Sequence, residues 1–335
     1  MAPPLLALTM GEPGGIAGEI TLAAWKMLRD RDEAQFFIIG DPKHLGGKAA
    51  IATINSPQEA RTVFKSGLPV LEHRLDHEVT IGVADPANAQ SVLSSIKKAV
   101  DLALTGEVGG IVTNPIQKES LYSQGFAFQG HTDFLADLAR KAGYEANPVM
   151  MLSAKDLRTV PITVHIALKD VPDALSRALI ISQTETTVEG LSRWFGLGRP
   201  RVGITGLNPH AGEGGAMGSE EIEFISPAIA DLQAKGIDAT GPLPADTVFH
   251  EEARCQYDVI MCMYHDQALI PVKTLGFHDG VNTTLGLPFV RTSPDHGTAL
   301  SLAGKGIANP SSLIAAIRQA ASMANNDAGA PKVLK

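Results

Sequence analysis

Short apolar runs alternate with longer amphipathic segments along this chain, and this alternation is the feature that most constrains its fold. Runs with the length and composition of buried strands fall at 5–9, 36–40, 78–83, 110–113, 148–152, 159–166, 201–206 and 257–263. Helices are expected after the Gly-rich turn at 11–15 up to about residue 28, and at 90–104, 132–141, 184–195, 219–235 and 311–324. Strands that alternate with helices in this way predict an α/β fold with parallel strands.

The size and charge of the chain agree with this fold class. Its 335 residues predict two domains or one large α/β unit, at roughly 150 residues per domain. No internal repeat or flexible linker separates two halves, so two domains are expected to interlock. Lys and Arg number 28 against 36 Asp and Glu, which gives a net charge of −8. Since no Lys/Arg cluster appears, we expect no nucleic-acid partner.

The cysteines and the N-terminal residues indicate the cellular compartment in which we expect the protein. Cys255 and Cys262 do not form a CxxC pair, and a disulfide framework is not expected at this size. This fits a reducing cytoplasm. Residues 1–10 carry no positive charge and only a short apolar run, so they make a poor signal peptide. No uncharged apolar stretch reaches about 18 residues, and we expect no membrane span.

Three histidines, His165, His210 and His265, stand where apolar runs end. Strand ends and the loops beyond them are where α/β enzymes place reactive groups. Three imidazoles suffice for a catalytic metal site with one position open to water or substrate. Their separations match no short metal-binding motif, so three hydrogen-bonded loop or core histidines remain the alternative on spacing alone.

Two segments have the pattern of a helix that starts after a loop. His131 precedes Thr132, a candidate N-cap for the helix at 132–141, and free N–H groups there can hold a phosphate or carboxylate. The glycines of the turn at 11–18 do not form the GxGxxG fingerprint of dinucleotide sites. A plain capped helix and a tight strand-to-helix turn are the alternatives.

Lys273, Asn282 and Arg291 are spaced by nine residues each in a Gly-rich region of low helical propensity. Loops that carry isolated cations between apolar strands suit anion recognition, and three solvated surface residues are the alternative. The segment 295–299 follows, where Gly297 allows a close backbone approach to a ligand and the next helix offers its N-terminus.

Taken together, these segments resemble one known family. They read LTMGEPGGIAGEI at 8–20, GHTDFLA at 130–136, GLNPHAGEGG at 206–215, GPLPADT at 241–247, MYHDQALIPVK at 263–273 and VNTTLGLPFVRTSPDHGTAL at 281–300. On these motifs the chain is identified as a member of the 4-hydroxythreonine-4-phosphate dehydrogenase family, which acts in pyridoxal phosphate biosynthesis.

The resemblance implies two interlocked α/β domains with a cleft between them, like isocitrate and isopropylmalate dehydrogenases, in a homodimer with shared active sites. We expect the first domain at 1–125 and 300–335, and the second, with the dimer contact, at 126–299.

Residue roles also follow from the resemblance. The metal histidines of the family fall on His165, His210 and His265, with ligands drawn from both partners. The substrate contacts fall on His131, Thr132, Lys273, Asn282 and Arg291. The segment with His296, Gly297 and Thr298 is similar to the adenosine-binding loop of the wider superfamily, which implies binding of NAD, or NADP, without the glycine fingerprint. Asp246 is expected beside the metal, and Lys273 or Asp246 is expected to act as the catalytic proton relay.

The implied reaction is oxidation of 4-phosphooxy-threonine at C3, followed by decarboxylation to 3-amino-2-oxopropyl phosphate. Among divalent cations, Zn²⁺ suits three imidazoles best, with Mg²⁺ or Co²⁺ as alternatives. A related dehydrogenase acting on phospho-threonate, phospho-erythronate or a dihydrodiol carboxylate is the nearest alternative. A metal-dependent hydrolase or lyase and a non-catalytic metabolite-binding protein are the others.

Overall fold

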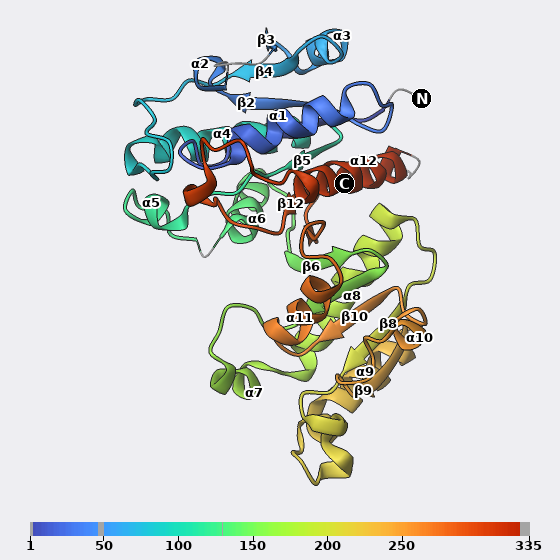
Figure 1. The fold of residues 1–335 in the computed structure, drawn as a ribbon. Helices are drawn as coiled ribbons and strands as arrows, with labels where there is room; N and C mark the ends of the chain where they lie inside the picture. The colour runs from blue at the N-terminus through green and yellow to red at the C-terminus, as the bar shows by residue number, and fades with distance from the viewer. Residues whose placement is uncertain (1–2, 46–49, 129, 329–335) are drawn as a thin grey trace. The chain divides into compact units, whose positions relative to one another are not determined.

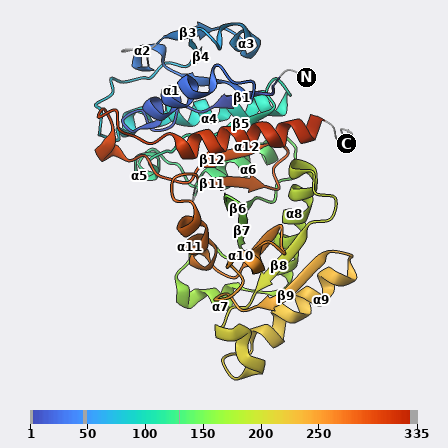
Figure 2. The same cartoon turned by 45° about the vertical axis from the view of Figure 1, so that its right-hand side comes forward.

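The fold is seen in a computed structural model that describes residues 3–45, 50–128 and 130–328. The chain divides into two compact units, which Figures 1 and 2 show from two directions. Met1–Pro148 and Leu287–Lys335 form the first unit, and Val149–Gly286 form the second. Within the described residues, no helix has both the length and the apolar composition that crossing a membrane requires.

The first unit is built on a parallel sheet. Its strands are β1 (Leu5–Leu8), β2 (Gln35–Gly40), β3 (Ile51–Ile54), β4 (Leu68–Glu72), β5 (Gly110–Val112) and β12 (Arg291–Pro294), in the order β3-β4-β2-β1-β5-β12. Every neighbouring pair in this order runs parallel. In the central strand β1 all four residues are buried, as expected for a strand covered on both faces.

Helices cover both faces of this sheet. They are α1 (Ala17–Leu28), α2 (Pro42–Leu45), α3 (Ala60–Val63), α4 (Ala89–Leu104), α5 (Lys118–Tyr122), α6 (His131–Lys141) and α12 (Ser311–Ala328). Helices α4 and α6 pack together on one face, while α1 and α12 contact each other on the other (Figure 2). The packing of α6 on α4 and the pairing of β12 with β5 place both elements in the first unit. The boundaries therefore differ from the expected 1–125 with 300–335 and 126–299.

The second unit has a mixed sheet. Its strands are β6 (Val149–Ala154), β7 (Leu157–Pro161), β8 (Arg201–Thr205), β9 (Asp238–Leu243), β10 (Val259–Cys262) and β11 (Val281–Leu285), in the order β11-β6-β7-β10-β8-β9. Strand β6 runs antiparallel to both of its neighbours, whereas β7, β10, β8 and β9 are parallel. The carboxyl ends of β7, β10 and β8 therefore lie at one edge of the sheet.

The helices of the second unit also lie on both faces of their sheet. They are α7 (Val171–Ala174), α8 (Arg177–Phe195), α9 (Ser226–Ala234), α10 (Glu251–Arg254) and α11 (His265–Leu275). Helix α11 packs on β6, β7 and β10 through the buried Ala268 and Val272. Helix α8 lies against β11 at Gly190, where a Cβ atom would come within 2.9 Å of the Leu285 side chain.

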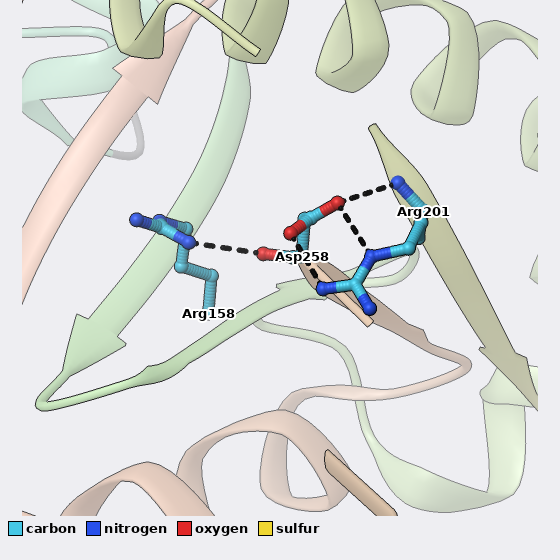
Figure 3. A network of polar contacts seen from close by, with 3 residues as sticks. All are labelled: Arg158, Arg201 and Asp258. Carbon is cyan, nitrogen blue, oxygen red and sulfur yellow. Dashed lines mark hydrogen bonds and ion pairs between the residues drawn. The ribbon is translucent and has the colours of Figure 1, made fainter. Parts of the chain in front are cut away.

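A charged clamp joins the amino ends of β7, β10 and β8 (Figure 3). Asp258, just before β10, accepts hydrogen bonds from the Arg201 Nε at 3.1 Å and Nη2 at 3.0 Å, and from the Arg201 backbone N–H at 2.8 Å. Its backbone carbonyl accepts a bond from Arg158 Nη1 at 3.2 Å. Arg201 keeps the pKa of Asp258 below its usual value. We call Arg158, Arg201 and Asp258 the amino-edge clamp.

Several expected elements differ from the structure, and the helix expected at 184–195 already begins at Arg177. Residues 78–83 form no strand, because Ile81 and Val83 are exposed and the segment turns over the Gly-rich loop, where the Gly82 N–H donates to the Gly14 carbonyl. The strand expected at 159–166 ends at Pro161. The helix expected at 219–235 contains a π-helical turn, Glu221–Ile225, ahead of α9.

Candidate active site

The three histidines of the sequence analysis follow three neighbouring parallel strands of the second unit. His165 lies in the loop after β7, His210 in the loop after β8, and His265 is the first residue of α11 after β10. Because β10 pairs with both β7 and β8, the three segments start at the same edge of one sheet. This is the edge at which α/β enzymes bind their ligands.

Two of these imidazoles face each other. The ring centroids of His165 and His265 are 5.5 Å apart, with an angle of 44° between the ring planes. His265 Nδ1 donates to Asp266 Oδ1 at 2.7 Å, which leaves Nε2 as the nitrogen that can ligate a cation. Two imidazole donors are the right chemistry for Zn²⁺ or a similar cation. Among the residues described here, no three His, Cys, Asp or Glu side chains gather into a complete set of ligands.

The third histidine is held on a loop of unusual backbone conformation. His210 and Ala211 have φ angles of 52° and 53°, in the left-handed region that non-glycine residues seldom occupy. Buried Glu221 fixes this loop: its Oε1 accepts from the Leu207 and Asn208 backbone N–H groups, each at 2.8 Å. A Cβ atom on Gly212 would come within 2.5 Å of the same carboxylate, so the loop closes tightly around it.

Helix α11 brings His265 and Lys273 to one surface. A shallow groove of about 420 Å³ runs along the helix and is lined by His265, Asp266, Leu269, Ile270, Lys273 and Thr274. These residues recur with helical periodicity, so an imidazole and an ammonium group share one wall. The ammonium group of Lys273 also lies 5.8 Å from the centroid of the Phe277 ring.

The prediction that Lys273, Asn282 and Arg291 lie in loops is wrong. Lys273 lies in α11, Asn282 in β11 opposite Leu152 of β6, and Arg291 opens β12. Burial of Ala268 and Val272 stabilises α11 despite Pro271 within the helix.

Asp246 lies in the turn after β9 and is exposed. Within the described residues it does not complete a cluster with the histidine pair. Its expected place beside a metal therefore stays a prediction.

The first unit holds a second group of predicted residues around His131. This histidine is the first residue of α6, and its Nε2 atom is buried without a hydrogen-bond partner among the described residues. Burial lowers its pKa well below the usual value, and the nearby charges of Arg291 and Lys118 lower it further. His131 is therefore neutral at pH 7 and lies in a positive field.

Arg291 is the most deeply buried charge of this group. It is 2% exposed, and its Nη2 donates to Thr113 Oγ1 at 2.6 Å. Burial lowers its pKa to about 9, so it stays cationic at neutral pH. A buried cation beside a neutral imidazole is suited to a phosphate or carboxylate group.

Thr132 does not cap α6. The N-cap is Gly130, which offers no side chain, and Thr132 is the second residue of the helix. Lys118, at the start of α5, belongs to the same group although no sequence pattern points to it. The two segments meet only in the folded unit, where a Cβ atom on Gly130 would lie 3.5 Å from Lys118 Nζ.

The Gly-rich turn and the segment 296–299 come together in the first unit. The Ile16 N–H donates to the Thr298 carbonyl at 3.1 Å, and a Cβ atom on Gly15 would come within 2.8 Å of that oxygen. Thr298 also donates through Oγ1 to Gln117 Oε1 at 3.2 Å. The turn at 11–18 therefore supports the segment expected to bind the cofactor.

The segment itself has features of a ligand-binding loop. His296 Nδ1 donates to the Gly297 carbonyl at 2.9 Å, while its Nε2 is buried with no partner in the described part of the chain. A Cβ atom on Gly297 would meet open space. An orphaned ring nitrogen and this open side fit the edge of a heterocycle such as adenine. The helix expected next is only a three-residue 3₁₀ turn, Leu300–Leu302, so it offers no N-terminal anion site.

Glu12 is a further buried carboxyl group in this region. It is 4% exposed, and burial raises its pKa above the usual value, although a bond from the Gly14 N–H acts in the opposite direction. The sequence shows only a glutamate in a Gly-rich turn, whereas the fold bonds its backbone N–H to the distant Pro115 carbonyl.

Comparison with known proteins decides the family. The family model for pyridoxal phosphate biosynthetic protein PdxA matches residues 32–320. The chain is 50% identical to 4-hydroxythreonine-4-phosphate dehydrogenase of Caulobacter vibrioides over 324 residues, which cover 95% of this chain and 97% of the relative. It belongs to the PdxA family. This confirms the family predicted from the motifs and the prediction that the chain is a dehydrogenase.

Solved structures of PdxA proteins share its architecture. The 1.25 Å crystal structure of 4-hydroxythreonine-4-phosphate dehydrogenase from Klebsiella pneumoniae is 35% identical and superposes with a TM-score of 0.84, covering 96% of this chain and 99% of that one. The predicted α/β fold class is confirmed. A terephthalate 1,2-cis-dihydrodiol dehydrogenase from Burkholderia xenovorans LB400 shares the fold at 24% identity and a TM-score of 0.66, covering 95% of this chain and 98% of that one. The PdxA family implies a nicotinamide cofactor and a divalent metal.

Proposed function

We propose that the protein oxidises 4-phosphooxy-L-threonine at C3 with NAD and releases 3-amino-2-oxopropyl phosphate and CO₂, a step of pyridoxal phosphate biosynthesis. Near-full-length membership of the PdxA family carries this proposal. The site chemistry supports it: the first unit has the buried cation Arg291 beside neutral His131, which suits an anion, and the second has an imidazole pair, which suits a divalent cation.

We propose His165, His210 and His265 as ligands of one divalent cation, with Zn²⁺ as the best match to imidazole donors. When bound, the cation supplies Lewis-acid polarisation of the C3 oxygen, and the nicotinamide accepts the hydride. Asp266 holds His265 so that its Nε2 is available as a ligand. One chain offers a facing pair rather than a full set in its described part, so we propose that a second copy completes the site in a homodimer.

Substrate recognition follows from the charges of the two units. Arg291 and Lys118 would bind an anionic group of the substrate, and neutral His131 would donate or accept a hydrogen bond at its buried Nε2. Thr132 and Asn282 are the other proposed contacts. Lys273, on the groove wall shared with His265, would hold and relay a proton at Nζ, and Asp246 is the second candidate for that role.

The cofactor is proposed to bind at His296, Gly297 and Thr298, with NAD preferred and NADP as the alternative. His296 Nε2 would accept or donate the hydrogen bond for which the described residues supply no partner. Gln117 and the Gly-rich turn would keep Thr298 in place.

A direct spectrophotometric assay of NADH formation tests the proposed function. The full chain is mixed with 4-phosphooxy-L-threonine and NAD, and NADH absorbance is followed with and without a metal chelator. We expect NADH to appear and the rate to fall on chelation and recover with added Zn²⁺. Parallel reactions with NADP, phospho-threonate and phospho-erythronate test specificity. Faster turnover of either acid phosphate, which lacks the amine, would overturn the proposed substrate.

A further inference from the structure

A buried amide connects two of the histidine-bearing segments of the second unit. Gln267 is 8% exposed, and its Oε1 accepts from the Met263 N–H at 2.6 Å and from Thr205 Oγ1 at 2.8 Å. Its Nε2 donates to the Gly206 carbonyl at 2.9 Å. Thr205 ends β8 and Gly206 opens the His210 loop, whereas Met263 and Gln267 flank His265. One side chain therefore fixes the distance between these two segments.

The third segment is attached at the same point. The Thr163 hydroxyl donates to the Met263 carbonyl at 2.8 Å, and the Thr163 N–H donates to that oxygen at 3.3 Å. Thr163 lies two residues before His165, so Met263 is bonded to the His165 segment through its carbonyl and to Gln267 through its N–H. We call Thr163, Thr205 and Gln267 the carboxyl-edge network.

The chemistry of Gln267 matches the groups that it bonds at these positions. An amide offers an acceptor oxygen and a donor nitrogen on the same planar group. A carboxylate would face the Gly206 carbonyl with a second acceptor, and an apolar chain would leave the Thr205 hydroxyl, the Met263 N–H and the Gly206 carbonyl unpaired. Packing alone would not require a polar residue here, since the neighbouring Ala268 and Met263 are fully buried and apolar.

We propose that Gln267 is a positioning residue that sets the mutual placement of the His165, His210 and His265 segments and thereby raises the affinity of the site for a divalent cation. The proposal rests on the proposed function only in taking these histidines as cation ligands. In a site shared by two copies, each copy would present its histidines in the geometry that this network fixes.

The test compares the two ends of the same three strands. Gln267→Met removes every bond of the amide at similar volume, and Asp258→Asn weakens the amino-edge clamp as the matched control. Metal-free full-length protein is titrated with Co²⁺ against a chromophoric chelator, and the visible spectrum of bound Co²⁺ is recorded. We expect Gln267→Met to weaken Co²⁺ binding by about 10-fold or more and to alter the spectrum. Asp258→Asn should change neither quantity.

Isosteric variants keep the inference testable if Gln267→Met fails to fold. Thr205→Val and Thr163→Val each remove one hydroxyl bond, and each should weaken Co²⁺ binding by about 3-fold. Thr184→Val, which removes a buried hydroxyl bond within α8, should have no effect. Unchanged affinity and spectrum in every folded network variant would overturn the inference. If wild-type protein binds no Co²⁺, or if His265→Ala binds it equally well, the proposed cation site itself fails.

Discussion

The two edges of the strand trio β7, β10 and β8 are built differently. At the amino edge, charged side chains make the clamp of Arg158, Arg201 and Asp258, and none of these three residues has a left-handed backbone. At the carboxyl edge, neutral hydrogen bonds join the strands, and His165 and His210 have φ angles of 50° and 52°. The same strands are therefore joined by charged groups at one edge, and by neutral hydrogen bonds beside left-handed histidines at the other.

This difference shows how a sheet separates stability from function. Left-handed backbone at a non-glycine residue costs about 1–2 kcal/mol, which a fold retains only where the surroundings enforce it. Both histidines with left-handed backbone, His165 and His210, lie at the carboxyl edge, where we propose the cation site. The charged clamp lies where no ligand is proposed, so changes there should affect folding alone.

The largest expected effect is loss of activity when His210 is removed. His210→Ala should lower turnover by at least about 100-fold. Removing a residue that only supports a metal ligand typically costs about 10- to 100-fold in activity, and removing a ligand itself should cost more. His210→Gly should be equally inactive but more stable than His210→Ala by about 1 kcal/mol, since glycine adopts the left-handed conformation without strain. NADH formation and chemical denaturation measure the two effects, and full activity in either variant would contradict the role of His210.

A smaller effect is expected when the anchor of the His210 loop is removed. Glu221→Ala should lower the free energy of unfolding by about 2–3 kcal/mol, because the Leu207 and Asn208 N–H groups lose a charged acceptor. Glu220→Ala is the control, since Glu220 is less buried than Glu221, bonds the Asn208 side chain instead of the Leu207 and Asn208 N–H groups, and should contribute less than about 0.5 kcal/mol. Equal decreases in the free energy of unfolding of the two variants, measured by urea denaturation, would contradict the role of the Glu221 carboxylate as the anchor of the His210 loop.

At the opposite edge, Asp258→Asn should lower the free energy of unfolding by about 1 kcal/mol while activity stays at the wild-type level. Arg201 keeps part of its hydrogen bonding to the amide but loses the opposite charge. Urea denaturation and steady-state rates measured on one preparation test this. A fall in turnover without a change in stability would contradict the inference that the amino edge contributes to folding and not to activity.

The smallest expected effect is the pH dependence of the stability difference between wild type and Asp258→Asn. Because Arg201 lowers the pKa of Asp258 in the folded state, the carboxylate stabilises the protein above its unfolded pKa of about 3.9. This stabilisation is lost as the pH falls through the lower folded pKa. The difference between wild type and Asp258→Asn should therefore be constant near neutral pH and shrink below about pH 4. A difference that grows on acidification would contradict this assignment.

The features that sequence predicts best are those with a local cause. Helix α4 follows from the spacing of Val92, Ile96 and Val100, and the histidines stand at strand ends because apolar runs stop before them. The apolar residues at 78–83 suggested a strand, but no partner strand buries them.

Features that depend on distant contacts were not predictable. The sequence does not predict strands β3, β4, β9, β11 and β12, and both β4 and β9 contain a proline. Gln267 bonds residues 62 positions away in the chain, and Lys118 reaches the His131 region only through the fold. The His210 loop, in which His210 has a left-handed conformation, is bonded to the distant Glu221 carboxylate, and the local sequence around the histidine does not reveal this contact.

The division of the chain into units has a consequence for its synthesis. The second unit is one continuous segment, whereas the first gains β12 and α12 only after residue 286. While the ribosome is still adding those residues, β5 has no β12 to pair with and Thr292 is missing from its place beside Val112. A nascent chain halted before residue 287 would therefore expose a sheet edge that the finished protein covers.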